Sequence, residues 1–237
     1  MGTLYLIATP IGNLQDITLR AIKTLFEVDV IACEDTRRAG LLLETMISPY
    51  TALRGKAPHH KPKFISYYDQ NELRRIPEII SLLQRGMKVA LISDAGTPAI
   101  SDPGFKLVRE CVVHKLKIEA IPGASSVPTA VIVSGLPTDK FFFAGYPPHK
   151  QGHRTKFFQN LKKSQEAMKS TVVLFEAPHK IIRTLEDMKA VLGDVPIVLA
   201  RELTKVHEEL RRERISEALE HFQKTTPKGE FIILYHE

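Results

Sequence analysis

Short apolar runs alternate with helical patterns five times along the first part of the chain. The apolar runs predict buried strands at 4–8, 28–33, 64–68, 89–92 and 118–121. Between them, apolar residues recur every three or four positions, which is typical of helices that cover a sheet. A helical crossover returns the chain to the same end of the sheet, so strands connected in this way lie parallel. We therefore predict an α/β fold with a parallel N-terminal sheet and ligand-binding loops at the carboxyl ends of its strands.

The helix that follows the second apolar run is predicted to be capped by Thr36 and to extend through Met46, the last residue of its apolar face. Beyond it, prolines interrupt the pattern, so the basic segment 47–63 is predicted to be a long loop.

A polar run that starts at His149 indicates a domain boundary. We predict an N-terminal α/β domain at 1–147 and a smaller mixed α/β domain at 148–237. The second domain is expected to contain a basic helix, strands at 171–175, 197–200 and 231–235, and helices after Pro178 and at 215–222. The charged stretch 206–215 fits neither pattern.

The composition is that of a mildly basic globular protein. A net charge of +6 permits a polyanionic partner without identifying one. Cys33 and Cys111 lack the spacing of a zinc or redox motif, which indicates reduced core residues of a cytoplasmic protein. The histidines lack the cysteine or carboxylate neighbours of a metal site, so no metal is predicted. The chain shows neither a signal-peptide pattern nor an apolar run of membrane-spanning length.

The segment Ser93–Gly104 follows an apolar run and precedes a helix. It contains no lysine or arginine, the chain has no G-x-x-x-x-G-K-[ST] motif, and no G-x-G-x-x-G motif follows a predicted strand. Its hydroxyl groups and the carboxylates of Asp94 and Asp102 suit a ligand that carries positive charge and hydroxyls better than a phosphate. The alternative is a turn rich in glycine and proline that caps the next helix.

Eight short motifs occur in the order found in a known family. They are ATPIGNL at 8–14, EDTR at 34–37, SDAGTPAISDPG at 93–104, PGAS at 122–125, GLPTD at 135–139, FEAPH at 175–179, ARELTK at 200–205 and KGE at 228–230. In these motifs the sequence resembles the tetrapyrrole-methylase-like methyltransferases, and among them the branch that modifies small-subunit ribosomal RNA. The resemblance extends from Leu4 to Tyr235.

The resemblance implies S-adenosylmethionine as methyl donor. In the family this donor lies folded in a cleft between two domains, held largely by backbone groups and by an acidic residue of the loop at 93–104. Carried over to this sequence, the implied donor-binding residues are Pro10, Asp94, Ala95, Gly96, Thr97, Ala124, Ser125, Phe175 and Ala200.

The implied reaction is 2′-O-methylation of the ribose of a cytidine in the decoding region of small-subunit (16S) ribosomal RNA. The implied partner is this RNA or the assembled small subunit, and the implied assembly is a homodimer. Two other functions stay open. One is methylation of tetrapyrrole precursors, which are small carboxylate-rich rings, and the other is RNA binding in ribosome assembly without catalysis.

Methyl transfer to a ribose hydroxyl places that oxygen in line with the methyl group, and a nearby carboxylate could accept its proton. Asp35 and Glu72 are weak candidates for this base, and the family supplies no base to carry over. The alternative for 34–37 is a charged helix start. RNA contacts are expected at a set of polar and basic residues that would otherwise be solvated surface, namely Asn13, Arg37, Arg38, Arg54, Lys56 and Lys61.

Overall fold

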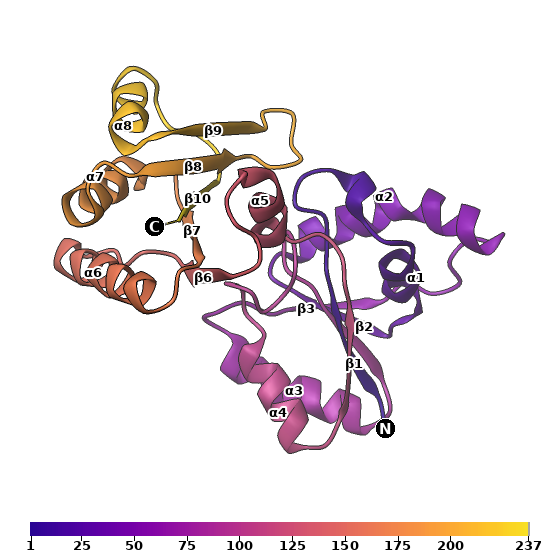
Figure 1. Cartoon of the computed structure of the whole chain (residues 1–237). Coiled ribbons are helices and arrows are strands. Elements are labelled where there is room, and N and C mark those ends of the chain that lie inside the picture. Colours follow the sequence, from indigo (N-terminus) through magenta and orange to yellow (C-terminus); the bar gives the residue numbers. More distant parts are fainter. Residues whose placement is uncertain (237) are drawn as a thin grey trace. The chain divides into compact units, whose positions relative to one another are not determined.

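The structure, a computed structural model, describes residues 1–236. The chain divides into two compact units, Met1–Ser125 and the part that begins at Ser126, each with its own sheet (Figure 1). This division falls earlier than the predicted boundary between residues 147 and 148. The reason is that β6 (Phe141–Gly145) pairs in parallel with β7 (Thr171–Glu176), so the segment before the polar run already belongs to the second sheet.

The first unit is built on five parallel strands, as predicted. In spatial order they are β3 (Lys63–Ser66), β2 (Val30–Cys33), β4 (Lys88–Leu91), β1 (Thr3–Ile7) and β5 (Lys117–Ile121). All neighbours in this sheet pair in parallel. The loops after these strands therefore emerge at one edge, which we call the carboxyl edge.

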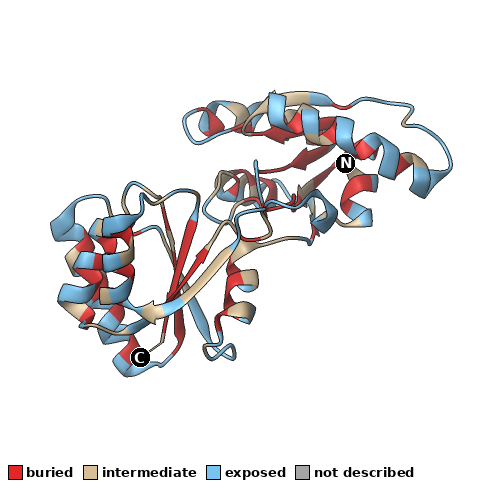
Figure 2. Ribbon diagram, turned by 90° about the horizontal axis from the view of Figure 1, so that it is seen from above, coloured by how far each residue is buried: buried red, intermediate tan, exposed pale blue. Residues whose placement is uncertain are grey.

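Helices cover both faces of this sheet, and their buried sides face the strands (Figure 2). The helices α1 (Leu19–Glu27) and α2 (Thr36–Arg54) pack on one face, whereas α3 (Glu72–Gln84) and α4 (Phe105–Val113) pack on the other. A short 3-10 helix, η1 (Leu14–Asp16), lies in the loop after β1. Because both faces are covered, the central strands read as continuous apolar runs.

The helix α2 is longer than predicted. It continues through Pro49 to Arg54, so the loop predicted at 47–63 is shorter and follows Gly55. A proline inside a helix removes one backbone hydrogen bond. Packing compensates here, because Tyr50 is buried with its ring centroid 4.8 Å from that of Phe26, and Gly55 then ends the helix in the left-handed conformation.

The second unit contains a mixed sheet in the order β6-β7-β10-β8-β9. Its other strands are β8 (Pro196–Arg201), β9 (Glu209–Arg214) and β10 (Phe231–Tyr235), and these pair antiparallel. One face is covered by α5 (Ser126–Ser134), and the other by α6 (Gln151–Ala167), α7 (Ile181–Leu192) and α8 (Ile215–Lys224). Within residues 1–236 no helix combines the length and apolar character that a membrane span requires.

Candidate functional site

Two loops meet at the carboxyl edge of the first sheet. The backbone of Thr9, after β1, pairs with that of Gly96, after β4, and each N–H donates to the carbonyl oxygen of the other at 2.9 and 3.1 Å. The Thr9 hydroxyl also donates to the Ser93 carbonyl oxygen at 3.2 Å. These bonds hold the loop 93–104 beside the segment that starts at Pro10. Further along that segment, Asn13 caps η1 by accepting a backbone hydrogen bond at 3.0 Å.

A third loop, which follows β5, is tied to the same place. The Thr97 hydroxyl donates to the carbonyl oxygen of Ala124 at 3.1 Å. The structure thus brings together Pro10, the segment 94–97 and the segment 124–125, which are three of the predicted donor-binding segments. Each begins three residues after the end of a parallel strand, which is why they converge.

The loop 93–104 has an unusual backbone. Gly96 and Gly104 have positive φ angles of 86° and 143°, and Ala99 and Ser101 also have positive φ, at 67° and 60°. Residues other than glycine rarely adopt this conformation. A Cβ atom at Gly96 would lie 3.2 Å from Cγ2 of Ile11, so the loop packs directly on its neighbour. Backbone strain of this kind concentrates at ligand sites.

Asp94 connects this loop to the start of α2. Its Oδ1 accepts from the backbone N–H of Asp35 at 3.3 Å, and its Oδ2 pairs with Nη1 of Arg38 at 3.0 Å. Asp35 is the N-cap of α2, and its carboxylate accepts hydrogen bonds from the guanidinium and the backbone N–H of Arg37. These bonds hold the pKa of Asp35 far below its usual range, so Asp35 is a weak proton acceptor.

Glu34, which precedes Asp35, lies in an environment that has the opposite effect on the pKa of its carboxyl group. It lies half-buried directly after β2, and no basic side chain within residues 1–236 forms an ion pair with it. Burial, together with the negative charges of Asp102 and Asp94, raises the pKa of Glu34 to about 7. The prediction from sequence did not include Glu34 as a candidate. A carboxylate that directly follows a buried strand, near an acidic loop, was the available signal.

Glu72, the other predicted candidate for the base, lies in a buried network. It is 5% exposed, accepts a hydrogen bond from the Tyr67 hydroxyl at 3.1 Å and forms an ion pair with Lys106. Burial, followed by the charge of Glu72, raises the pKa of Tyr67 and keeps its hydroxyl a donor. Glu72 thus connects the start of α3 to α4, and its two oxygens are already engaged.

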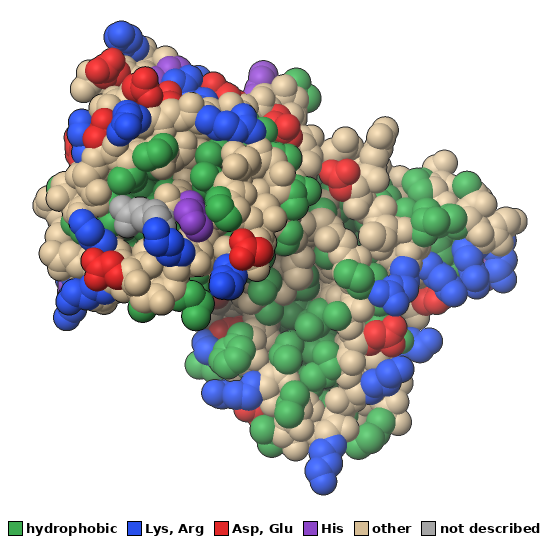
Figure 3. Space-filling model, viewed as in Figure 1, with side chains coloured by type: hydrophobic (Ala, Val, Ile, Leu, Met, Phe, Trp, Pro, Cys, Tyr) green, Lys and Arg blue, Asp and Glu red, His purple; other side chains and the backbone are tan. Residues whose placement is uncertain are grey.

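The predicted RNA contacts fall into two separate groups. Arg37 and Arg38 lie in the first turn of α2, at the carboxyl edge, whereas Arg54 lies in its last turn, roughly 25 Å away along the helix. Lys56 and Lys61 are exposed in the loop that leads from α2 to the start of β3. Figure 3 shows lysine and arginine side chains gathered at this far end of α2. The structure therefore does not bring the second group to the loop 93–104.

Two further predicted donor contacts are near neighbours in the second sheet. Phe175 in β7 and Ala200 in β8 both pair with Ile232 of β10, which lies between them. Paired residues point to the same face, here the face that α5 covers. The ring of Phe175 contacts those of Phe143 and Tyr146, with centroids 4.8 and 5.5 Å apart. Phe175 is partly exposed and Tyr146 is exposed, whereas Ala200 is fully buried, so the second unit presents aromatic rings at this position.

The fold is shared with other proteins of known structure. Diphthine synthase superposes with a TM-score of 0.71 at 16% identity, over 99% of this chain and 90% of that chain. Uroporphyrin-III C-methyltransferase from Thermus thermophilus, in a structure complexed with S-adenosylhomocysteine, superposes with a TM-score of 0.61 at 17% identity, over 98% and 97% of the two chains. Residues 3–219 match the model of the tetrapyrrole (corrin/porphyrin) methylases, and the chain belongs to this family.

The similarity to one branch of the family is much closer. The ribosomal RNA small subunit methyltransferase I of Thermotoga maritima is 43% identical over 234 residues, which cover 99% of this chain and 98% of the relative. Within the tetrapyrrole methylases, the chain is thus a member of the ribosomal RNA small subunit methyltransferase I group, and the resemblance seen in its motifs is confirmed.

Proposed function

We propose that the protein transfers a methyl group from S-adenosylmethionine to the 2′-hydroxyl of a cytidine in the decoding region of small-subunit ribosomal RNA. The observation that carries this proposal is the similarity over nearly the whole chain to ribosomal RNA small subunit methyltransferase I. The convergence of three loops at the carboxyl edge supports it, because such an edge is where parallel α/β sheets bind ligands.

The carboxyl edge fits a donor that carries positive charge and hydroxyl groups. Asp94 and Glu34 supply negative charge, and the loop 93–104 contains no basic residue. Gly96 has a φ of 86°, a backbone conformation that glycine adopts without a steric penalty. We assign donor binding to Pro10, Asp94, Ala95, Gly96, Thr97, Ala124 and Ser125 in the first unit and to Phe175 and Ala200 in the second. When bound, S-adenosylmethionine supplies an electrophilic methyl group on a positively charged sulfur.

We assign the base to Glu34 in place of Asp35 and Glu72. Glu34 would accept the proton of the ribose 2′-hydroxyl. At the same time the 2′-oxygen would form its bond to the methyl carbon and the bond between that carbon and sulfur would break. Glu34 would then release the proton to water. A pKa of about 7 makes Glu34 a proton acceptor of suitable strength at neutral pH. Asp35 binds protons too weakly, and the oxygens of Glu72 are engaged by Tyr67 and Lys106.

RNA contacts are assigned by position. Asn13, Arg37 and Arg38 are proposed to meet the RNA near the carboxyl edge. Arg54, Lys56 and Lys61 would form a second contact at the far end of α2, which only a large nucleic acid can reach. For the assembly we propose a homodimer, which analytical ultracentrifugation tests. Large apolar side chains exposed on α3 and α4 support this proposal, namely Leu73, Phe105, Val112 and Val113.

One labelling experiment tests the reaction. The protein is incubated with methyl-labelled S-adenosylmethionine and, in parallel, with assembled small subunits, naked small-subunit RNA and a tetrapyrrole precursor. The RNA is then digested with alkali. We expect label in an alkali-resistant dinucleotide, because a 2′-O-methyl group prevents attack of that hydroxyl on the adjacent phosphate. Assembled subunits should be the better substrate, since proteins recognise folded RNA largely by its shape.

The other outcomes distinguish the alternatives. Label in ordinary mononucleotides would mean methylation of a base. Label in the tetrapyrrole precursor would identify a biosynthetic enzyme, and RNA binding without transfer would identify an assembly factor. Each of these results contradicts the proposed function.

A further inference from the structure

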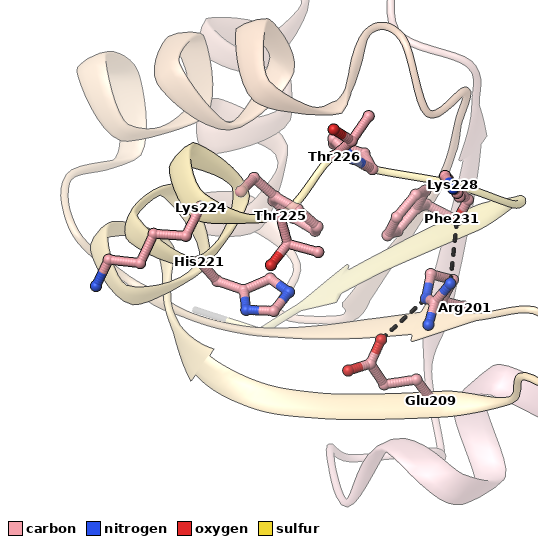
Figure 4. Close-up of a pocket in the computed structure, with 10 residues that line it drawn as sticks. Arg201, Glu209, His221, Lys224, Thr225, Thr226, Lys228 and Phe231 are labelled. Atoms are coloured by element: carbon pink, nitrogen blue, oxygen red, sulfur yellow. Dashed lines mark hydrogen bonds and ion pairs between the residues drawn. The ribbon is translucent and has the colours of Figure 1, made fainter.

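A pocket in the second unit lies on the opposite face of the sheet from Phe175 and Ala200. Its volume is about 460 Å³, within the range of small-ligand sites. Residues of β8, β9, α8 and the connection from α8 to β10 line it (Figure 4). Arg201 is one of these residues and directly follows Ala200, and successive residues in a strand point to opposite faces. The pocket, which we call the α8 pocket, is therefore separate from the assigned donor contacts.

The α8 pocket contains a fixed guanidinium group. The Nε atom of Arg201 donates to Glu209 at 2.9 Å, and its Nη1 atom donates to the carbonyl oxygen of Lys228 at 3.3 Å, as the dashed lines in Figure 4 mark. Glu209 also lies 3.7 Å from the guanidinium of Arg211, so two arginines share its negative charge. Arg201 is thus held in one orientation, and its Nη2 group has no partner among residues 1–236.

The other polar side chains of the lining are basic or carry hydroxyl groups. Lys224 and Lys228 are exposed, and with Arg201 they give three positive side chains against the single negative Glu209, which leaves two positive charges. The other polar groups in the lining are His221, Thr225 and Thr226. Threonine hydroxyls donate hydrogen bonds, and imidazole has a donor N–H in either charge state.

The pocket has a rigid apolar base. Phe222 and Phe231 are 7% and 2% exposed, and their rings pack edge to face with centroids 5.6 Å apart. The ring of His221 packs on Phe222 at 5.1 Å. Low-polarity walls beside the cations strengthen their attraction for an anion, because the local dielectric constant is lower than that of water. The fixed arginine, the excess positive charge and these walls together match a phosphate group better than a neutral ligand.

We propose that the α8 pocket binds a phosphodiester group of the RNA substrate, at a position remote from the methylated ribose. This inference rests on the proposed function and extends it, since it adds a third RNA contact, in the second unit, to the two proposed in the first unit. A small substrate held beside Phe175 and Ala200 cannot reach through a sheet, whereas an RNA strand can pass around its end. Phosphate contacts of this kind position a nucleic acid without reading its bases.

The test compares two double variants that lose the same charge. Lys224→Gln with Lys228→Gln removes both pocket lysines and keeps the carbonyl group that Arg201 binds. The matched control is Lys156→Gln with Lys163→Gln, which removes two exposed lysines of α6. Binding to a fluorescent RNA from the small-subunit decoding region is measured from 0.05 to about 0.3 M salt. Thermal melting checks folding, and labelled methyl transfer is measured for the native protein.

We expect the pocket variant to bind RNA on the order of tenfold more weakly at 0.1 M salt, with the logarithmic salt slope reduced by about 0.7 for the loss of one phosphate contact. The control should keep the native slope. Equal affinities for the two variants, in a protein whose native form methylates RNA, would overturn the pocket while leaving the proposed function intact. Absence of methyl transfer by the native protein would instead overturn the proposed function. If the native protein bound inorganic phosphate more tightly than the RNA, an RNA phosphodiester would also be overturned as the ligand of the α8 pocket.

Discussion

Replacing Glu34 by Gln should remove the acidic limb of the pH profile for methyl transfer. Glu34 can accept a proton only when it is ionised, and its pKa of about 7 places that change near neutral pH. Activity of the native protein should therefore rise with pH through this value. With a pKa of about 7, about a tenth of Glu34 is ionised at pH 6 and about nine tenths at pH 8. The value of kcat/KM should fall about tenfold for each pH unit below 7.

The two kinetic parameters should report different pKa values. The pH profile of kcat/KM for S-adenosylmethionine reports pKa values of the protein without bound donor, whereas the profile of kcat reports those of the complex with donor and RNA. Glu34 beside a bound sulfonium is stabilised in its charged form, so the limb in kcat should lie at lower pH than the limb in kcat/KM. Loss of a general base typically lowers the rate by roughly 10²–10⁴-fold, and Glu34→Gln should fall in this range on the alkaline plateau.

Single-turnover transfer of labelled methyl groups to assembled small subunits, followed from pH 5.5 to about 8.5, measures these changes. Glu34→Asp keeps a carboxylate and should retain the limb at a reduced rate, while Glu44→Gln removes an exposed carboxylate of α2 and should behave like the native protein. Calorimetry with S-adenosylmethionine separates donor binding from the transfer step. An unchanged acidic limb in Glu34→Gln would show that another group accepts the proton.

Two further predictions concern the loop 93–104. Asp94→Asn keeps the shape of the side chain but removes its charge, and it should weaken S-adenosylmethionine binding roughly tenfold or more in calorimetry, with Glu166→Gln on α6 as the control. Unchanged affinity would contradict the donor assignment. Gly104→Ala should lower the free energy of unfolding in urea by about 1–3 kcal/mol, because φ is 143° and the new Cβ would lie 2.8 Å from Cδ2 of Leu91. Gly152→Ala, in open space on α6, should not destabilise the protein, and equal losses for both would refute the steric argument.

The fold was largely predictable because its signals are local. Buried parallel strands read as apolar runs, and the helices between them have one apolar side. The errors have non-local causes. The length of α2 depends on the packing of Tyr50 against Phe26, which belongs to another helix. The edge strand β9 carries charges on both faces, so it lacks the alternation of apolar and polar residues that marks a strand.

The candidate site was predictable as a set of motifs but not as a set of chemical roles. The loops after β1, β4 and β5 could be placed at one edge from the order of strands and helices. The proton affinities of the carboxylates could not be predicted, because Glu34 and Asp35 are adjacent in sequence and their surroundings shift their pKa values in opposite directions. The charges that raise the pKa of Glu34 come from Asp94 and Asp102 in a distant loop, whereas Arg37 lowers the pKa of Asp35.

The charges at the carboxyl edge also bear on which substrate the protein can accept. Glu34, Asp94 and Asp102 lie close enough for their charges to interact, and a tetrapyrrole precursor carries several carboxylates of its own. Two like charges 4 Å apart near a protein surface repel by about 4 kcal/mol. A ribose hydroxyl is neutral, and Arg37 and Arg38 are exposed beside this edge, where phosphates of the same strand can meet them. The three carboxylates therefore disfavour a ring carboxylate beside them, whereas a neutral ribose hydroxyl meets no such repulsion. Glu34→Gln should reduce this discrimination. A carboxylate-rich ring should therefore displace RNA from the variant at a lower concentration than from the native protein.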